Sequence, residues 1–354
     1  MKILFDYSIF LKQSYGGISK YILNLADNLK KIKIQTEIFA PLTLSCNFSQ
    51  LHNYIYYVNL KRIPKFFTKI LNFLNYFLTY IYIFIKRPNL IHVTYHENLY
   101  NFLNIPVVVT VYDLIYEKFY NNFNKKKILE RASHIICISK NTQKDLLKYY
   151  NIDKSKVSVI YLGVSGNTYY KNSKKNQILY VGDRESYKNF DKFIIAFSRS
   201  KFLKKNYKIL CFGLKNFSIK EIKTFKELKI SSLINFKTGN DKLLYASYRE
   251  SKLFVNPSGY EGFGLTSLEA MQNSCPVIAN NIKVFKEIFK NACYYSNVQN
   301  TFEFSNAIEE ILKSKSIQKN LIKRGHKIVQ NYQWKDCAEK TKNIYQKLIK
   351  EKKY

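Results

Sequence analysis

The chain repeats one pattern along most of its length: a short run of apolar, mostly β-branched residues is followed by a longer amphipathic segment. These runs lack the polar alternation of a half-exposed strand, which indicates strands that are covered on both faces. Strands that alternate with helices are joined in parallel, because each helix carries the chain back across the sheet. The sequence therefore predicts an α/β fold with parallel, doubly wound sheets.

The strand-like runs form two series, which predicts two Rossmann-like sheets in tandem. A polar, turn-rich stretch at 162–177 separates the series and is the expected linker, and the tail from about 301 is helical. In such folds ligands bind beyond the carboxyl ends of the strands, here in a cleft between the domains. The expected strands are KILFDY (2–7), QTEIFA, YIYYVN, LIHVTY (90–95), VVVTVY (107–112), HIICIS (134–139) and VSVIYL (157–162), then ILYVGD (178–183), KILCFG (208–213), LINFKT (233–238), LFVNP (253–257), PVIANN (276–281) and ACYYS (292–296).

The charge of the chain limits its partners. The 58 Lys and Arg residues against 25 Asp and Glu give a net charge of +33, which attracts nucleic acid, anionic lipid or nucleotide phosphates. An AT-rich coding sequence explains part of this excess, since Lys, Asn, Ile, Tyr and Phe are abundant together. Short runs such as Lys125-Lys126-Lys127 and Lys204-Lys205 predict only a solvated surface.

The six cysteines indicate the compartment. They are scattered without a C-x-x-C pair, and several lie inside apolar runs, as buried thiols in a reducing compartment do. The N-terminus MKILFDYSIF is too short and too acidic for a signal peptide and fits a first strand better. We therefore expect a cytoplasmic protein.

One segment leaves two interpretations open. Residues 61–86 begin with basic residues and continue into an apolar, aromatic helix that is short for a membrane span. Such a helix suits the surface of an anionic membrane, which would place the protein at the inner membrane face. A core helix packed on the first sheet explains the same pattern equally well.

The stretch NPSGYEGFGLTSLEAMQNSCPVIANN places two carboxylates, Glu261 and Glu269, around a glycine turn formed by Gly262, Phe263 and Gly264. A strand ends before the turn and a helix begins after it, so backbone N–H groups beside the glycines form an anion site. The Glu269 carboxylate can accept two hydrogen bonds from a ribose diol, as in dinucleotide folds. A favourable position for an acid in a first helical turn would explain Glu269 alone, but not the whole motif.

A cationic pair follows the end of ILYVGD, where Arg184 and Lys188 are four residues apart. Arg can clamp a diphosphate with two hydrogen bonds, and Lys adds a point charge. Together they can stabilise a departing nucleoside diphosphate without a metal ion. The chain has no Asp-x-Asp pair, so we predict neither a metal site nor a cofactor. A solvent-facing helix start is the alternative for this spacing on its own.

Two further glycines, Gly16 and Gly17, lie between the first strand and the first long helix in SYGGISKY. They allow this loop to approach a phosphate or a sugar from the other domain. An ordinary turn is the alternative, because a Gly-Gly pair alone is a weak signal.

The motif EGFGLTSLEAM, followed by CPVIANN, closely resembles the retaining GT-B glycosyltransferases of the "glycosyl transferases group 1" family. ILYVGDRESYKNF, LLYASYRESKLFVNPS and KEI follow the same family pattern. FDYSIFLKQSYGGISKY at the front and YQWKDCA near the end also match, so the resemblance covers most of the chain. The opening is similar to a mannosyltransferase-like branch.

The resemblance implies a GT-B fold, in which two Rossmann-like domains face an interdomain cleft. It implies an acceptor-side domain at 1–165, a nucleotide-sugar-binding domain at 176–330, and a C-terminal helix at 331–354 that packs back on the N-terminal domain.

The family also implies roles for the glycine turn. The glutamate that matches Glu269 holds the ribose, and the one that matches Glu261 faces the hydroxyls of the transferred sugar. The backbone N–H groups of Gly262, Phe263 and Gly264 would contact that sugar and the β-phosphate.

The residue that assists proton transfer is the weakest match. Family members often have a histidine at the end of a strand like VVVTVY, where this chain has Tyr112. His96, which ends the preceding strand, is the other candidate, whereas His92 fits a packed core position. The leaving diphosphate can itself take the proton of the acceptor in retaining enzymes of this kind. Ser139 is expected to cap a helix.

These features predict a metal-independent, retaining glycosyltransferase for cell-surface polysaccharide. It would move a hexose, with mannose among the candidates, from a nucleotide sugar to a glycan or a lipid-linked acceptor. A basic nucleic-acid-binding protein is an alternative, although no recognition-helix or base-stacking motif supports it. A sugar-nucleotide epimerase of the same architecture is another.

Overall fold

The structure is a computed structural model, and it divides into two compact units. The first unit is Met1–Gly163 with Gln333–Tyr354, and the second is Val164–Tyr332. The structure describes residues 1–13, 16–43, 55–59, 67–96, 100–101, 103–165, 173–184 and 186–352.

The sheet of the first unit is parallel throughout, in the order β3-β2-β1-β4-β5-β6-β7. Its central strands are buried along their whole length, as their unbroken apolar runs predict. The strands are β1 (Lys2–Phe5), β2 (Gln35–Thr43), β3 (Ile55–Asn59), β4 (Leu90–Val93), β5 (Val107–Val111), β6 (His134–Cys137) and β7 (Val157–Val159).

The sheet of the second unit is also parallel, in the order β10-β9-β8-β11-β12-β13. Each strand-like run in the sequence has become a strand of one of these two sheets, which confirms the predicted α/β fold. The strands are β8 (Lys175–Val181), β9 (Lys208–Phe212), β10 (Ile234–Lys237), β11 (Ser251–Asn256), β12 (Val277–Asn280) and β13 (Tyr294–Ser296).

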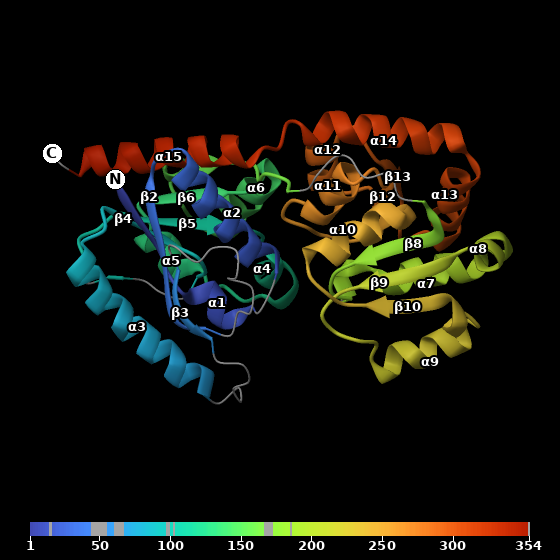
Figure 1. Cartoon of the computed structure of the whole chain (residues 1–354), viewed down its shortest axis with the longest axis horizontal. Helices are drawn as coiled ribbons and strands as arrows, with labels where there is room; N and C mark the ends of the chain where they lie inside the picture. Colours follow the sequence, from blue (N-terminus) through green and yellow to red (C-terminus); the bar gives the residue numbers. More distant parts are fainter. Residues whose placement is uncertain are drawn as a thin grey trace. The chain divides into compact units, whose positions relative to one another are not determined.

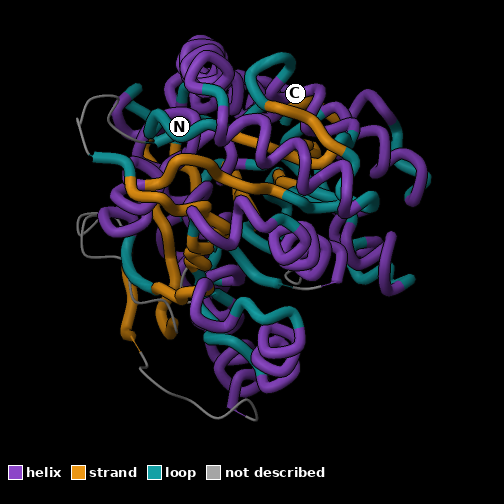
Figure 2. Tube along the Cα trace, turned by 90° about the vertical axis from the view of Figure 1, so that its right-hand side faces the viewer, coloured by secondary structure: helices purple, strands orange, loops and turns teal. Residues whose placement is uncertain are grey.

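Helices cover both faces of each sheet (Figures 1 and 2). In the first unit they are α1 (Ser8–Lys12), α2 (Gly17–Lys31), α3 (Phe67–Lys86), α4 (Ile115–Tyr120), α5 (Lys126–Arg131), α6 (Lys140–Tyr149) and α15 (Trp334–Glu351). In the second unit they are α7 (Phe190–Arg199), α8 (Lys201–Asn206), α9 (Ile219–Glu227), α10 (Asp241–Glu250), α11 (Leu265–Gln272), α12 (Lys283–Phe289), α13 (Thr301–Lys313) and α14 (Lys315–Val329).

The helices form where the apolar spacing and the caps agree. In α7, Phe190, Phe193 and Phe197 recur at helical spacing and enter the core of the second unit. The Ser139 hydroxyl accepts a hydrogen bond from the Thr142 N–H at the start of α6, which confirms the predicted cap.

The last helix, α15, belongs to the first unit, as the GT-B resemblance implies. It packs against α2, and the Tyr345 hydroxyl lies 2.5 Å from Nδ1 of His92 in β4. His92 is fully buried and stacks on Phe5, which confirms the packed core histidine. At the start of the helix, Trp334 lies so close to Gly163 that a side chain there would clash with the indole ring. The return of the chain therefore depends on close packing at both ends of α15.

Both sheets are wound outward from their first strand. The strand β1 lies between β2 and β4, and β8 lies between β9 and β11. The connections leave in opposite directions at β1/β4 and at β8/β11, which is the arrangement at which such folds generally bind ligands. These two switch points are where ligand-binding residues are expected in each unit.

A buried ion pair stabilises the first unit beside its sheet. Lys125 Nζ lies 2.8 Å from both carboxylate oxygens of Glu117, and the two side chains are 2% and 0% exposed. Tyr150 donates its hydroxyl to the same carboxylate at 2.6 Å. The prediction that Lys125 lies on a solvated surface is therefore wrong, whereas its neighbour Lys126 is exposed. Tertiary packing places Glu117 against Lys125, and the run of lysines in the sequence gives no sign of this contact.

We expect Lys125→Met to lower the free energy of unfolding by about 3–5 kcal/mol, because it leaves the Glu117 carboxylate buried without its cation. Adding Glu117→Gln should restore most of this loss, since the amide oxygen still accepts from Tyr150. Chemical denaturation of both variants measures the effect. A single variant as stable as the parent chain would contradict the importance of the pair.

Candidate active site

In the second unit, the loops after β8 and β11 are joined by hydrogen bonds at the switch point. Gly259 donates its N–H to the Tyr187 carbonyl at 2.7 Å, and the Asn189 amide donates to the Pro257 carbonyl at 3.0 Å. A Cβ atom on Gly259 would lie 3.1 Å from Asn189 Nδ2, so the loops approach closely. This pairing fixes residues that are far apart in sequence beside one another.

The joined loops bring Lys188 and Glu261 into contact. Lys188 Nζ lies 2.7 Å from Glu261 Oε1, and each side chain is 19% exposed. The short helix Ser186–Lys188 and the turn before α11 present the two groups from opposite loops. The sequence predicted both residues for the site, and the structure places a cation and an anion together at its edge.

The glycine turn leads directly into α11, which begins at Leu265. Gly264 adopts φ +93°, and a Cβ atom there would lie 2.6 Å from Phe289 and 2.9 Å from Phe285. Glycine is therefore required twice, by the backbone conformation and by the space. Phe263 is 3% exposed and packs edge-on against Tyr332, so its side chain anchors the turn in the core.

Glu269 lies on the second turn of α11, as its fifth residue, and is 2% exposed. The alternative that Glu269 is only an acid favoured by the helix dipole in the first turn is therefore wrong, because the first turn of α11 contains no acid. Asp241, the first residue of α10, has its pKa raised to about 6. Burial is the larger cause, and the nearby Glu269 carboxylate is the second. Two carboxyl groups thus lie near each other behind the glycine turn.

Arg184 makes its contacts with α9 and the loop before it. Its Nε donates to Glu221 at 2.5 Å, and its guanidinium also donates to the carbonyls of Lys215 and Asn216. The guanidinium carbon lies 5.0 Å from the centre of the Phe217 ring, and the side chain is 7% exposed. The structure therefore brings Lys188 to Glu261 but gives Arg184 protein partners of its own.

The switch point of the first unit is held by a buried carboxylate, Asp6. Its oxygens accept hydrogen bonds from the N–H and the hydroxyl of Thr94, both at 2.7 Å. The Ser8 and Tyr100 hydroxyls also donate to it. Asp6 follows β1 and Thr94 follows β4, so this network joins the two strand ends between which a ligand would enter.

His96 follows the same strand end and is 7% exposed, between the rings of Tyr95 and Tyr112. Burial, together with the charges of Lys125 and Lys12, lowers the pKa of His96 well below its ordinary value. The ring is therefore neutral at physiological pH. Among the described residues, none makes a hydrogen bond to its Nδ1.

Gly16 and Gly17 start α2, which also lies beyond β1. The Ser19 hydroxyl accepts from the Gly16 N–H at 3.1 Å and caps the helix. Gly16 has φ −179°, which any residue adopts, whereas a Cβ atom on Gly17 would meet none of the described residues within 4 Å. Open space at Gly17 therefore lies at the start of a long helix.

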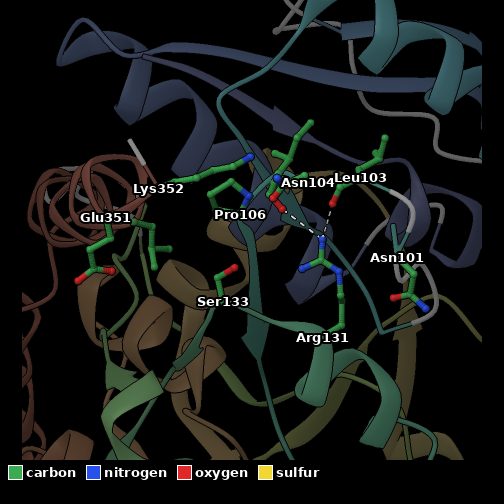
Figure 3. A pocket seen from close by; sticks show the side chains of 10 residues that line it. Asn101, Leu103, Asn104, Pro106, Arg131, Ser133, Glu351 and Lys352 are labelled. Carbon is green, nitrogen blue, oxygen red and sulfur yellow. Dashed lines mark hydrogen bonds between the residues drawn. The ribbon is translucent and has the colours of Figure 1, made fainter. Parts of the chain in front are cut away.

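A hollow of about 660 Å³ lies elsewhere in the first unit (Figure 3). Its lining includes Pro106 and Ser133, which precede β5 and β6, so it lies at the amino edge of the sheet. The Arg131 guanidinium there donates to the carbonyls of Tyr100, Leu103 and Ile105. These partners, and the distance from the carboxyl edge, exclude this hollow from the candidate site.

Two family models match the chain in succession. Residues 15–166 match "Glycosyltransferase Family 4", and residues 167–328 match "Glycosyl transferases group 1". Residues 167–328 belong to the glycosyl transferases group 1 family, and the two matches together span most of the chain. The family resemblance predicted from the sequence is thereby confirmed, whereas the retaining mechanism stays a prediction.

Individual relatives agree with this family. The O-antigen chain mannosyltransferase RfbU of Salmonella typhimurium is 29% identical over 205 residues, which cover 56% of each chain. The aligned part thus spans little more than half of that relative. Sucrose-phosphate synthase of Thermosynechococcus elongatus has the same fold, with a TM-score of 0.81, 19% identity and 98% of each chain covered.

A second solved structure has the same fold. Anabaena Alr3699/HepE in complex with UDP-glucose has a TM-score of 0.80 at 14% identity, over 98% of this chain and 100% of that chain. At this identity the likeness establishes the fold alone, and it confirms the predicted GT-B architecture.

Three acidic residues near the switch points were missed in the sequence. Glu221 could have been suspected as a helix start, because Ser218 and Glu221 form a capping box. Asp6 was visible as a polar residue at the end of an apolar strand. Asp241 carried no signal, because only the packing of α10 beside α11 brings it near Glu269.

The family turn gives a stability prediction. Gly264→Ala should lower the free energy of unfolding by about 3 kcal/mol, because the new methyl group meets Phe285 and Phe289 at an unfavourable φ. Gly17→Ala is the matched control and should leave stability unchanged, since no described residue lies within 4 Å of its Cβ atom. Thermal or urea unfolding measures both, and equal effects would show that the turn tolerates a side chain.

The buried histidines give a pH prediction. Burial lowers the pKa of His92 to about 3, whereas the unfolded chain takes up its proton near pH 6.5. The contribution of His92 to stability is therefore complete above pH 6.5 and is lost as the pH falls towards 3. The expected loss is about 1.4 kcal/mol per pH unit.

His92→Gln tests this linkage, because the amide can still reach Tyr345 and Thr110. The free energy of unfolding, measured from pH 7 to pH 5, should fall less steeply in the variant than in the parent chain. Parallel slopes would mean that His92 titrates alike in both states.

Proposed function

We propose that the chain is a metal-independent, retaining glycosyltransferase that moves a hexose from a nucleotide sugar to a glycan or a lipid-linked acceptor. Mannose is the favoured sugar, since RfbU is named as an O-antigen chain mannosyltransferase. The same name supports a role in cell-surface polysaccharide synthesis. The proposed location is the cytoplasm, at the inner membrane face where a lipid-linked acceptor is met.

The observation that carries the proposal is the Lys188–Glu261 ion pair at the β8/β11 switch point. An ammonium group has three donors, and Glu261 accepts from one of them at 2.7 Å. The β-phosphate of a bound donor can therefore approach Lys188, while the sugar hydroxyls donate to the Glu261 carboxylate. The pair keeps both charges satisfied until the nucleotide sugar replaces their mutual contact.

The rest of the nucleotide is assigned to the turn and to α11. The ribose hydroxyls would donate to Glu269, and the N–H groups of Gly262, Phe263 and Gly264 would face the β-phosphate and the sugar. Asp241 behind Glu269 adds negative charge, which favours hydroxyl or N–H donors of the ligand over its phosphates.

In the proposed reaction, the bond between the sugar C1 and the β-phosphate oxygen breaks. A bond from C1 to the acceptor oxygen forms on the same face of the sugar. The proton of the acceptor hydroxyl passes to the departing β-phosphate oxygen, so no protein base is needed. Lys188 stabilises the charge that develops on the diphosphate as it leaves.

Arg184 and His96 have supporting roles in the proposal. Arg184 lies beyond the end of β8 and adds positive potential, and it reaches a diphosphate only if its bond to Glu221 opens. His96 remains neutral, and its Nδ1 is buried, so it would accept from a sugar or acceptor hydroxyl only after the side chains around it move. Gly17 leaves room for a phosphate or a sugar at the start of α2.

The test compares Lys188→Met and Glu269→Gln with the control Lys192→Met, a lysine four residues away on the outer side of α7. Release of nucleoside diphosphate from GDP-mannose and UDP-hexoses is measured with EDTA present. Each site variant should lose about 100-fold in kcat/KM, and the control should lose nothing. Unimpaired turnover in both site variants would overturn the site assignment.

A thermal-shift measurement separates binding from chemistry. A donor that binds only the folded chain raises its melting temperature, by an amount equivalent to about 2.7 kcal/mol at 100 times Kd. The parent chain should show this shift with EDTA present, and Glu269→Gln should not. Conversion of the nucleotide sugar to its epimer without an acceptor would instead indicate an epimerase.

A further inference from the structure

The helix α3 carries a continuous apolar face that is turned to solvent. It runs along the outside of the first unit (Figure 1). By length and composition the helix could cross a membrane, and only 22% of its apolar stretch is buried within the protein. Phe73 is 69% exposed, Phe77 58% and Phe84 77%. The same face holds Phe67, Ile70, Leu74, Leu78, Ile81 and Ile85, all at least 36% exposed.

The polarity of α3 is inverted relative to a helix that packs on a soluble core. Its buried stripe is Leu71, Asn75, Thr79 and Ile83, so half of it is polar. Between Lys69 and Lys86, by contrast, every exposed residue of the helix is a large hydrophobic one. A surface helix in water exposes its polar face. The exposed face of α3 is apolar instead, as expected for a helix that contacts an apolar environment.

Polar contacts on the inner side fix α3 to its unit. Asn75 donates to the Leu42 carbonyl and accepts from the Leu42 N–H, both at 2.8 Å. The Tyr7 hydroxyl donates to the Asn72 carbonyl at 3.0 Å, and Tyr82 donates to Glu37 at 2.7 Å. These contacts with β2 and with the residue before α1 keep the helix attached along one side, so its apolar face is available to lie along a surface.

The ends of the apolar face are cationic. Lys69 in the first turn and Lys86 and Arg87 at the last turn are all exposed, and α3 itself contains no acid. An apolar stripe closed by cations at both ends matches the acyl chains and anionic headgroups of a lipid surface. The net charge of +33 acts in the same direction over a longer range.

A second copy of the chain fits this face poorly. Antiparallel contact of two α3 helices would place Lys69 of one copy beside Lys86 and Arg87 of the other. Two bodies of +33 each would also repel one another. Charge complementarity thus favours an anionic bilayer over self-association.

We propose that the outer face of α3 is a monotopic docking surface for an anionic lipid bilayer. The helix lies in the membrane plane, Phe73, Phe77 and Phe84 enter the acyl region, and Lys69 and Lys86 contact lipid phosphates. The proposal goes beyond the transferase activity, because it concerns the surface on which the protein works and holds whichever sugar is transferred.

The test is flotation of the full chain with vesicles of phosphatidylcholine containing 30% phosphatidylglycerol, as about a third of anionic lipid gives a strong surface potential. A variant with Phe73→Ser, Phe77→Ser and Phe84→Ser should partition to vesicles at least about 10-fold less than the parent chain. The matched control carries Leu214→Ser, Ile219→Ser and Phe302→Ser, three exposed apolar residues of the second unit. The control should bind like the parent chain.

The charge is tested separately with Lys69→Gln and Lys86→Gln, which should weaken binding to the anionic vesicles and reduce its salt dependence. Equal binding of the serine variant and its control would overturn the proposal. So would a parent chain that is dimeric without lipid and becomes monomeric in the serine variant, since the face would then join two copies.

Nucleoside diphosphate release by the serine variant in solution distinguishes this proposal from the proposed function. Unchanged release with lost vesicle binding supports both proposals. Vesicle binding by a chain that turns over no donor would leave the docking surface standing and overturn the transferase assignment alone.

Discussion

A parallel sheet wound in both directions from its first strand is the constraint on which the rest depends. Each unit has one place where neighbouring strands send their chains to opposite sides, at β1/β4 and at β8/β11. The loops that follow these strands carry most of the candidate site residues. In the second unit two such loops are joined by the Gly259–Tyr187 hydrogen bond, which sets Lys188 against Glu261.

The same constraint organises the first unit differently. There a buried carboxylate, Asp6, joins the strand ends, and burial keeps His96, two residues after Thr94, neutral. The second unit has an ion pair at its switch point, whereas the first has a carboxylate enclosed by N–H and hydroxyl donors, and a neutral ring. This division fits the proposed binding of a charged donor by one unit and of a sugar acceptor by the other.

Much of this could be predicted from the sequence because it is local. Apolar runs without alternation gave the strands, the glycines gave the turn before α11, and Ser139 gave a cap. The partner of Arg184 could not be predicted, since Glu221 comes from a different connection of the sheet. The prediction for Lys125 was wrong for the same reason, because only tertiary packing brings Glu117 against its ammonium group.

The sequence by itself determined the α/β class, the family motif and the apolar character of residues 70–85, because these depend on residue type and spacing. Only the tertiary structure decided which charges meet and which face of α3 is buried. Period and composition do not say that Asn75 turns inward to Leu42 while Phe73, Phe77 and Phe84 turn outward. The physical reason is that a buried polar side chain needs a hydrogen-bond partner, and the partner of Asn75 lies on a strand that is distant in sequence.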